Sequence, residues 1–119
     1  MEAKDALDGL SALAHETRLS VFRALVTAGA DGLAAGEIAE GLSVLPNTLS
    51  AHLAQLSRAG LVSATREGRS IRYRADYARI EALVGFLIRD CCGGRPEVCA
   101  PLAALAAECV ACAADNASA

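Results

Sequence analysis

Residues 32–58 limit the possible folds of this chain more than any other segment. Residues 32–42 predict a short helix that ends in a turn, and Pro46, a residue suited to the first position of a helix, then opens a second helix that runs to residue 58. At about 100° per residue, one side of this second helix is apolar and must face a core. Its members are Leu49, Leu53 and Leu56. A short helix, a turn and a second helix are the sequence form of a helix-turn-helix.

The hydropathy pattern changes to a period of two after Gly60, which predicts a β-hairpin. Residues 67–70 fit its tip. We expect Val62, Ala64, Ile71, Tyr73 and Ala75 on one face, with Arg72 and Arg74 on the other.

Apolar stripes at helical spacing predict flanking helices at about 3–14, 16–28 and 77–90, and Pro101 opens a last one to about residue 112. The stripes are Leu7, Leu10 and Leu13; Leu19, Phe22 and Val26; and Ile80, Leu83, Val84, Leu87 and Ile88. The third stripe would expose a large apolar patch on a small domain, so we expect it to form a dimer interface. The fold class is therefore mainly α with a small β-hairpin, a winged helix-turn-helix. We assign residues 1–90 to a DNA-binding and dimerisation domain and residues 91–119 to a cysteine-rich sensor segment.

Charge is segregated along the chain although the net charge is only −3. Residues 43–80 hold six arginines and two acidic residues, a local charge of +4, while the remainder carries −7. Such segregation indicates a polyanionic partner, although a solvated arginine-rich hairpin would look similar.

The outward face of the 46–58 helix is small and polar, which suits the major groove of DNA. Its candidate DNA-binding residues are Asn47, Thr48, Ser50, Ala51, Gln55 and Arg58, and those of the hairpin are Arg66, Arg69 and Arg72. An ordinary solvated surface is the alternative for this helix taken alone. We interpret His52 as a half-buried packing residue and His15 as a helix cap.

Several of these motifs together resemble the ArsR/SmtB family of winged-helix metalloregulatory repressors. The matching segments are residues 45–53, 60–62 and 66–69 with Tyr73, and residues 15–19, where His and Glu replace the usual Asp and Pro. The resemblance implies a homodimer joined through the first and last long helices, with the helix from Pro46 in the major groove and Arg69 at the tip of the wing. The family's Cys-Val-Cys arsenic site has no cysteine here, and its Asp and His zinc site has Asp76 but no histidine on the last long helix.

Three of the five cysteines, Cys91, Cys92 and Cys99, lie close together after this helix. The glycines at 93 and 94 and Pro96 would let the chain fold back, so that three sulfurs meet around one atom. Trivalent arsenic or antimony is satisfied by three thiolates, whereas zinc normally takes four protein ligands. The alternative is that these cysteines are small buried hydrophobes. Cys109 and Cys112 form a Cys-x-x-Cys pair, but they also continue an apolar stripe, which favours packing.

The sequence thus predicts an arsenite-responsive transcriptional repressor: the apo homodimer binds double-stranded operator DNA with an inverted repeat, and As(III) or Sb(III) at Cys91, Cys92 and Cys99 releases it. The rivals are a thiol redox or persulfide sensor and a soft-metal carrier that uses Cys109 and Cys112. The choice among As(III), Sb(III), methylated arsenic and Cu(I) stays open. No nucleophile and base set predicts an enzyme, no organic cofactor is expected, and the chain is expected to be cytoplasmic without a membrane segment.

Overall fold

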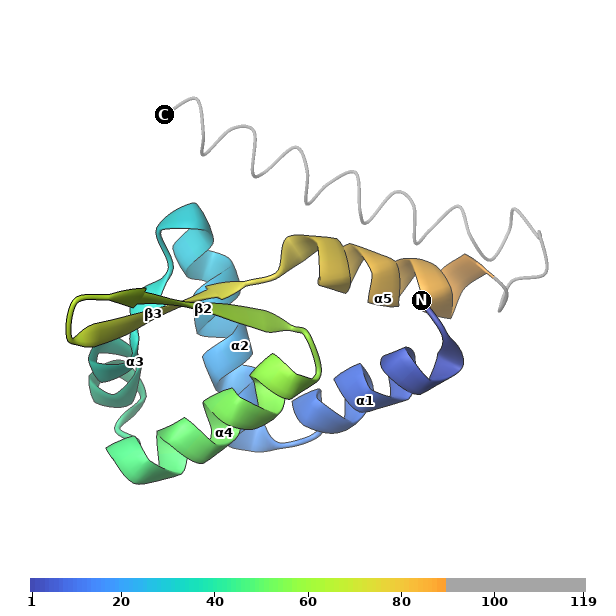
Figure 1. The fold of residues 1–119 in the computed structure, drawn as a ribbon. Coiled ribbons are helices and arrows are strands. Elements are labelled where there is room, and N and C mark those ends of the chain that lie inside the picture. The colour runs from blue at the N-terminus through green and yellow to red at the C-terminus, as the bar shows by residue number, and fades with distance from the viewer. Residues whose placement is uncertain (90–119) are drawn as a thin grey trace. The chain divides into compact units, whose positions relative to one another are not determined.

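The computed structural model describes residues 1–89, and the chain divides into a unit from Met1 to Leu83 and a second unit from Val84 onward. The elements run α1 (Ala3–Leu13), α2 (Glu16–Ala28), the 3-10 turn η1 (Gly29–Asp31), β1 (Leu33–Ala34), α3 (Ala35–Leu42), α4 (Pro46–Arg58), β2 (Val62–Glu67), β3 (Ser70–Ala75) and α5 (Tyr77–Arg89). This is the expected mainly helical winged helix-turn-helix. Figure 1 shows α3, the N-terminal end of α4 and the hairpin tip at the same end of the first unit.

Local signals fix the ends of the helices as the sequence predicts. His15 caps α2, where its Nδ1 accepts a hydrogen bond from the Thr17 N–H at 3.1 Å. Gly29 ends α2 with a φ of 72°, a region that favours glycine. Pro46 occupies the first turn of α4, where its missing N–H leaves no helical hydrogen bond unmade.

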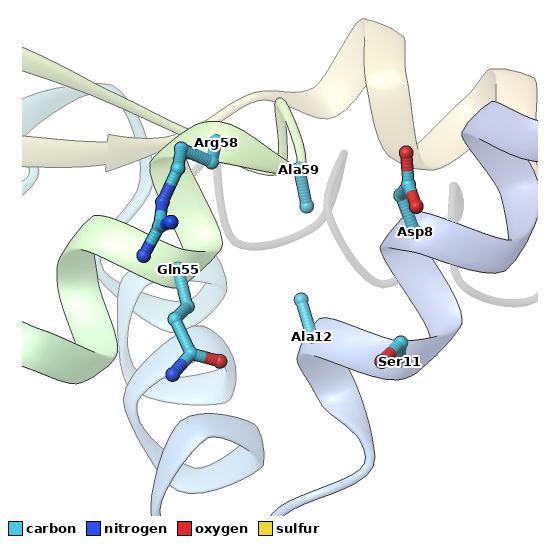
Figure 2. Close-up of a pocket in the computed structure, with 6 residues that line it drawn as sticks. All are labelled: Asp8, Ser11, Ala12, Gln55, Arg58 and Ala59. Carbon is cyan, nitrogen blue, oxygen red and sulfur yellow. The ribbon is translucent and has the colours of Figure 1, made fainter.

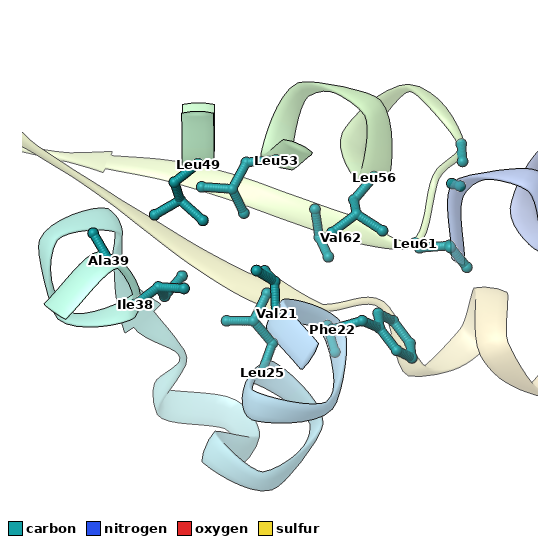
Figure 3. Close-up of a cluster of buried hydrophobic side chains, with 13 residues drawn as sticks. Val21, Phe22, Leu25, Ile38, Ala39, Leu49, Leu53, Leu56, Leu61 and Val62 are labelled. Atoms are coloured by element: carbon teal, nitrogen blue, oxygen red, sulfur yellow. The ribbon is translucent and has the colours of Figure 1, made fainter. Parts of the chain in front are cut away.

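The core lies among α2, α3, α4 and the base of the hairpin (Figure 3). Leu49, Leu53 and Leu56 are at most 1% exposed, which confirms the predicted inner face of α4. They face Val21, Phe22 and Leu25 of α2 and Ile38 and Ala39 of α3. Burying a leucine of this kind stabilises the fold by about 1.5–3 kcal/mol, so these three leucines hold α4 on the domain.

All three predicted stripes face outward in part. In α1 the buried residues are Ala6, Gly9 and Ala12, whereas Leu7 and Leu10 are exposed. The buried side of α1 faces Leu83, because a Cβ on Gly9 would lie in ordinary van der Waals contact, 3.5 Å, with a methyl of Leu83. Leu7 and Leu10 are therefore left on the surface, whereas Leu13 is partly buried against the core.

The predicted stripes of α2 and α5 are also only partly buried. Leu19 and Val26 of α2 are exposed, and only Phe22 of that predicted stripe is buried. In α5, Leu83 is buried, whereas Val84 and Leu87 are exposed. Leu83 therefore belongs to the core of the first unit, and it does not lie on a free dimer face.

The sheet has three antiparallel strands in the order β1-β3-β2. Its hairpin register pairs Glu67 with Ser70, so that Gly68 and Arg69 form a two-residue turn at the predicted tip. Ala64 and Ile71 are exposed, so the predicted buried face is confined to the base of the hairpin. The sequence analysis missed β1, which has only two residues and pairs Leu33 with Tyr73.

The first turn of α5 is attached to other helices of the first unit. Asp76 caps it by accepting a hydrogen bond from the Arg79 N–H at 3.0 Å. The Tyr77 hydroxyl donates to the Val26 carbonyl at 2.9 Å, and Arg79 pairs with Asp5 of α1 at 3.6 Å. No helix within residues 1–89 is long and apolar enough to cross a membrane. The predicted helix after Pro101 lies outside the described residues.

Candidate DNA-binding surface

The outer face of α4 carries every residue that the sequence predicts to approach DNA from this helix. All six are exposed: Asn47, Thr48, Ser50, Ala51, Gln55 and Arg58. No acidic residue lies in the first turn of α4, and Arg58 lies in its last turn. The face is therefore polar, small and free of negative charge, as major-groove entry requires.

The turn between α3 and α4 has a defined backbone conformation. Ser43 takes up the left-handed conformation with a φ of 55°, and the Val44 N–H donates to the Ala39 carbonyl at 2.9 Å. At the other end of α3, Glu37 accepts from the Ala34 N–H at 3.0 Å. The turn that presents α4 is thus a defined structure of the kind that ends helices.

The flank of α4 next to α2 carries a cluster of His15, Arg18 and His52. Arg18 donates from Nε to the Ala12 carbonyl at 2.6 Å, and its Nη1 lies 3.5 Å from the Nδ1 of His52. The rings of His15 and His52 are 4.6 Å apart. Burial first, then the charges of His15 and Arg18, lower the pKa of His52, so the neutral ring is favoured. His52 is half-buried, as predicted, and links α4 to α2.

The hairpin presents two exposed arginines near its tip. Arg69 occupies the turn and has no hydrogen bond or ion pair with any residue of the described range 1–89. Within residues 1–89 the guanidinium of Arg66 makes a single hydrogen bond, 3.4 Å from its Nε to the Gly68 carbonyl. Both guanidinium groups are therefore available to phosphates beside the face of α4.

Arg72 is different, because its guanidinium already has several partners. Its Nη1 donates to the carbonyls of Asp31 at 3.1 Å and Gly32 at 3.4 Å, and its Nε donates to Glu67 at 3.1 Å. Its Nη2 lies 3.9 Å from Glu37 of α3. The sequence analysis included Arg72 among the phosphate contacts, and that role stays a prediction; in the structure these bonds hold the wing against η1 and α3.

Arg74 has a similar position. It donates to the Ala30 carbonyl at 2.9 Å and to the Thr65 hydroxyl at 3.1 Å, and it pairs with Glu67 at 3.7 Å. The alternating pattern correctly placed Arg72 and Arg74 on one face of the hairpin. It could not predict their hydrogen bonds to carbonyls more than 40 residues away in the sequence.

A shallow depression of about 330 Å³ lies between α1 and α4 (Figure 2). Gln55 and Arg58 line it from α4, and Asp8 and Ser11 line it from α1. Gln55 and Arg58 therefore border both the outer face of α4 and this depression.

All five cysteines lie beyond residue 89, so the predicted sites at Cys91, Cys92 and Cys99 and at Cys109 and Cys112 lie outside the described residues. Within residues 1–89, no group of three or more His, Cys, Asp or Glu side chains is placed to hold a metal ion. Asp76, the acidic residue of the family's zinc position, is used as the cap of α5.

Comparison with known proteins identifies helix-turn-helix transcriptional regulators as similar to this chain. A family model described as a helix-turn-helix domain matches residues 13–63. The chain is 32% identical over 83 residues to the transcriptional activator HlyU of Vibrio cholerae, an alignment that covers 70% of this chain and 74% of HlyU. A structure of reduced HlyU from the same organism superposes with a TM-score of 0.60 at 31% identity, covering 76% of this chain and 92% of that one.

Two other solved structures are similar over most of the described chain. An ArsR-like transcriptional regulator from Rhodococcus has a TM-score of 0.66 and 31% identity, covering 86% of this chain and 90% of that chain. The homodimeric winged helix-turn-helix DNA-binding domain of Mb0332 from Mycobacterium bovis, a possible ArsR-family regulator, has a TM-score of 0.58 and 33% identity, covering 71% and 78%.

The fold and these similarities define a winged-helix transcriptional regulator, a class of DNA-binding proteins that are not enzymes. Within that class the chain belongs to the ArsR/SmtB-type family.

Proposed function

We propose that this chain is a dimeric operator-binding repressor whose release from DNA is controlled at Cys91, Cys92 and Cys99. The observation that carries the DNA-binding part is the exposed polar face of α4, together with Arg69, which has no partner among residues 1–89. In this proposal Asn47, Thr48 and Ser50 approach base edges, while Arg58, Arg66 and Arg69 contact phosphates.

The dimer in this proposal uses the exposed leucines of α1, Leu7 and Leu10, and the outward residues of α5. Leu7 is 65% exposed, and Val84 and Leu87 are also exposed, so a second copy would cover apolar surface that the folded chain leaves bare. The homodimeric state of the Mb0332 domain supports a dimer. Two-fold symmetry in the protein then requires an inverted repeat in the operator.

The inducer in this proposal is trivalent arsenic or antimony. Arsenous acid would exchange its three hydroxyl groups for the sulfurs of Cys91, Cys92 and Cys99, so that three As–S bonds form, three As–O bonds break and three water molecules leave with the thiol protons. Three thiols within nine residues support this ligand set, and arginines at 89 and 95 favour the thiolate form.

Thiol oxidation is a second candidate, favoured by the similarity to HlyU of Vibrio cholerae, which has been solved in a reduced form. Here Cys99 would form a disulfide with Cys91 or Cys92, losing two protons and two electrons to a peroxide, which is reduced to water. The same three cysteines carry both candidates, but only oxidation proceeds without a metalloid. A carrier role through Cys109 and Cys112 would instead leave the apo protein without specific DNA binding.

A titration of DNA release separates these candidates. The duplex is one recovered by selection from a random library with the full-length apo protein, and release is followed by fluorescence anisotropy with arsenite, antimonite, zinc or hydrogen peroxide. Cys91→Ser, Cys92→Ser and Cys99→Ser should bind the duplex normally and fail to release it with arsenite. The Cys109→Ser, Cys112→Ser double variant is the matched control and should respond like the wild type.

Each alternative has its own outcome. Arsenite-driven release that survives in Cys99→Ser would contradict the three-thiolate site. Release by peroxide but not by arsenite would establish the redox candidate. Because HlyU is described as an activator, transcription in vitro from the selected operator with and without the protein tests repression directly.

A further inference from the structure

Leu45, the N-cap residue of α4, is the most exposed large hydrophobic side chain in the described range 1–89, at 74%. It makes no side-chain cap hydrogen bond to the first turn of the helix. Helix N-caps strongly favour Ser, Thr, Asp or Asn, whose oxygens accept from the first free N–H groups. The start of the helix expected to enter DNA therefore lacks its usual cap.

The core does not explain this leucine. The neighbouring Val44 packs against the core cluster, and the apolar side of α4 begins at Leu49. Leu45 instead lies beside Pro46, Asn47 and Thr48, all of which are exposed. Position 45 therefore lacks a side chain that could cap α4 and exposes an apolar side chain instead. Neither feature stabilises the free protein.

We propose that Leu45 contacts the 5-methyl group of a thymine in each operator half-site, so that it is a specificity-determining residue of α4. This inference rests on the proposed function. The N-terminal residues of a recognition helix are those that reach base edges. The thymine methyl is the apolar group that base pairs present in the major groove, and aliphatic contact with it distinguishes thymine from the other bases.

The charges around Leu45 favour DNA over a protein partner. No acidic residue lies in the first turn of α4, and the exposed arginines Arg66 and Arg69 lie on the hairpin whose tip is at the same end of the unit as this turn (Figure 1). A polyanion is attracted to such a surface. In the complex, the leucine would lose water on contact with the methyl group, which offsets its exposure in the free protein.

The test uses the full-length protein and a duplex recovered by selection from a random library. Each thymine of one half-site is replaced in turn by deoxyuridine, which lacks only the 5-methyl group. For the wild type, one replacement should weaken binding about fourfold, the effect of one buried methyl-sized group. In Leu45→Ser, deoxyuridine at that position should not change the affinity for the duplex. Deoxyuridine at any other thymine that weakens binding of the wild type should weaken binding of Leu45→Ser equally.

Two controls separate contact from folding. Leu45→Met retains a flexible apolar side chain and should keep the sensitivity to deoxyuridine. Leu45→Ser restores a favourable cap, so its melting temperature should rise, which shows that any lost discrimination does not come from unfolding.

A deoxyuridine scan without effect in the wild type, or an effect that persists in Leu45→Ser, would overturn the inference while specific operator binding stands. A half-site without thymine would overturn it as well. Failure of the protein to select any duplex would contradict the proposed function itself, and the inference with it.

Discussion

Replacing Arg72 and Arg69 separately should give opposite results, although both are arginines of the same hairpin. Arg69 has no partner within the described residues, whereas Arg72 is bound to two carbonyls and to Glu67 and Glu37. We therefore expect Arg69→Ala to affect DNA binding and Arg72→Ala to affect the stability of the fold.

The magnitudes follow from the contacts. The hydrogen bonds of Arg72 to the carbonyls of Asp31 and Gly32 contribute about 0.5–1.5 kcal/mol each. Its ion pairs with carboxylates that are 47% and 56% exposed are screened by water and add less than about 1 kcal/mol. Arg72→Ala should therefore lower the free energy of unfolding by about 2 kcal/mol. Arg69→Ala should change it by less than about 0.5 kcal/mol.

Urea unfolding followed by circular dichroism measures the free energy of unfolding of each variant. The salt dependence of operator binding measures the number of phosphate contacts. Each phosphate contact contributes about 0.9 to the slope of log K against log salt, so Arg69→Ala should make the slope of a dimer shallower by about 1.8. Arg72→Ala should leave the slope unchanged. Arg72→Lys keeps the charge without the planar fork, so it should lose stability like the alanine variant.

The reasoning would be refuted by an Arg72→Ala protein that is as stable as the wild type and has a shallower salt slope. In that case Arg72 would be a phosphate contact, and its partners in the free protein would not hold the wing.

Three further predictions concern α4, the β1 turn and the dimer. Burial, then His15 and Arg18, lower the pKa of His52, so the unfolded chain binds its proton more readily. Stability should therefore fall as the pH drops below about 6.5, and His52→Gln should reduce this loss in thermal melts at several pH values. Gly32→Ala should lower the free energy of unfolding by more than about 1 kcal/mol, because the φ of Gly32 is 64° and a Cβ would overlap the Tyr73 carbonyl. Gly29 has a similar φ but open space around its Cα, so Gly29→Ala should lower the free energy of unfolding by less. Equal urea midpoints for the two variants would contradict this reasoning. Leu7→Asp should give folded monomers by sedimentation, and a dimer that survives it would exclude α1 from the interface.

The elements that could be predicted from the sequence are those with local signals. The period of Leu49, Leu53 and Leu56 and the position of Pro46 gave the bounds and the inner face of α4, and the change of period after Gly60 gave the hairpin. The exposed positions of α4 follow from the same geometry. The charge pattern also located the arginines of the wing.

Features that depend on contacts distant in the sequence could not be predicted in this way. β1 has two residues and exists only because Leu33 and Ala34 pair with β3. The buried side of α1 consists of small residues, among them Gly9, which faces Leu83, and this contact joins residues more than 70 positions apart. The partners of Arg72 come from a turn 40 residues earlier. A pattern of apolar and charged residues identifies which side chains share a face, but it does not identify what covers that face.

The attachments of α5 and α4 bear on how a ligand near Cys91 could alter DNA binding. A ligand changes an equilibrium only through different affinities for two states, and allosteric couplings are typically about 1–3 kcal/mol. The first turn of α5 is attached to α2 by the hydrogen bond between Tyr77 and Val26, and α2 is linked to α4 through Arg18 and His52. A single hydrogen bond contributes about 0.5–1.5 kcal/mol, so the rearrangement of one or two such contacts would supply the required coupling. Because these links join helices directly, a shift in α5 could change the position of α4 without unfolding either helix.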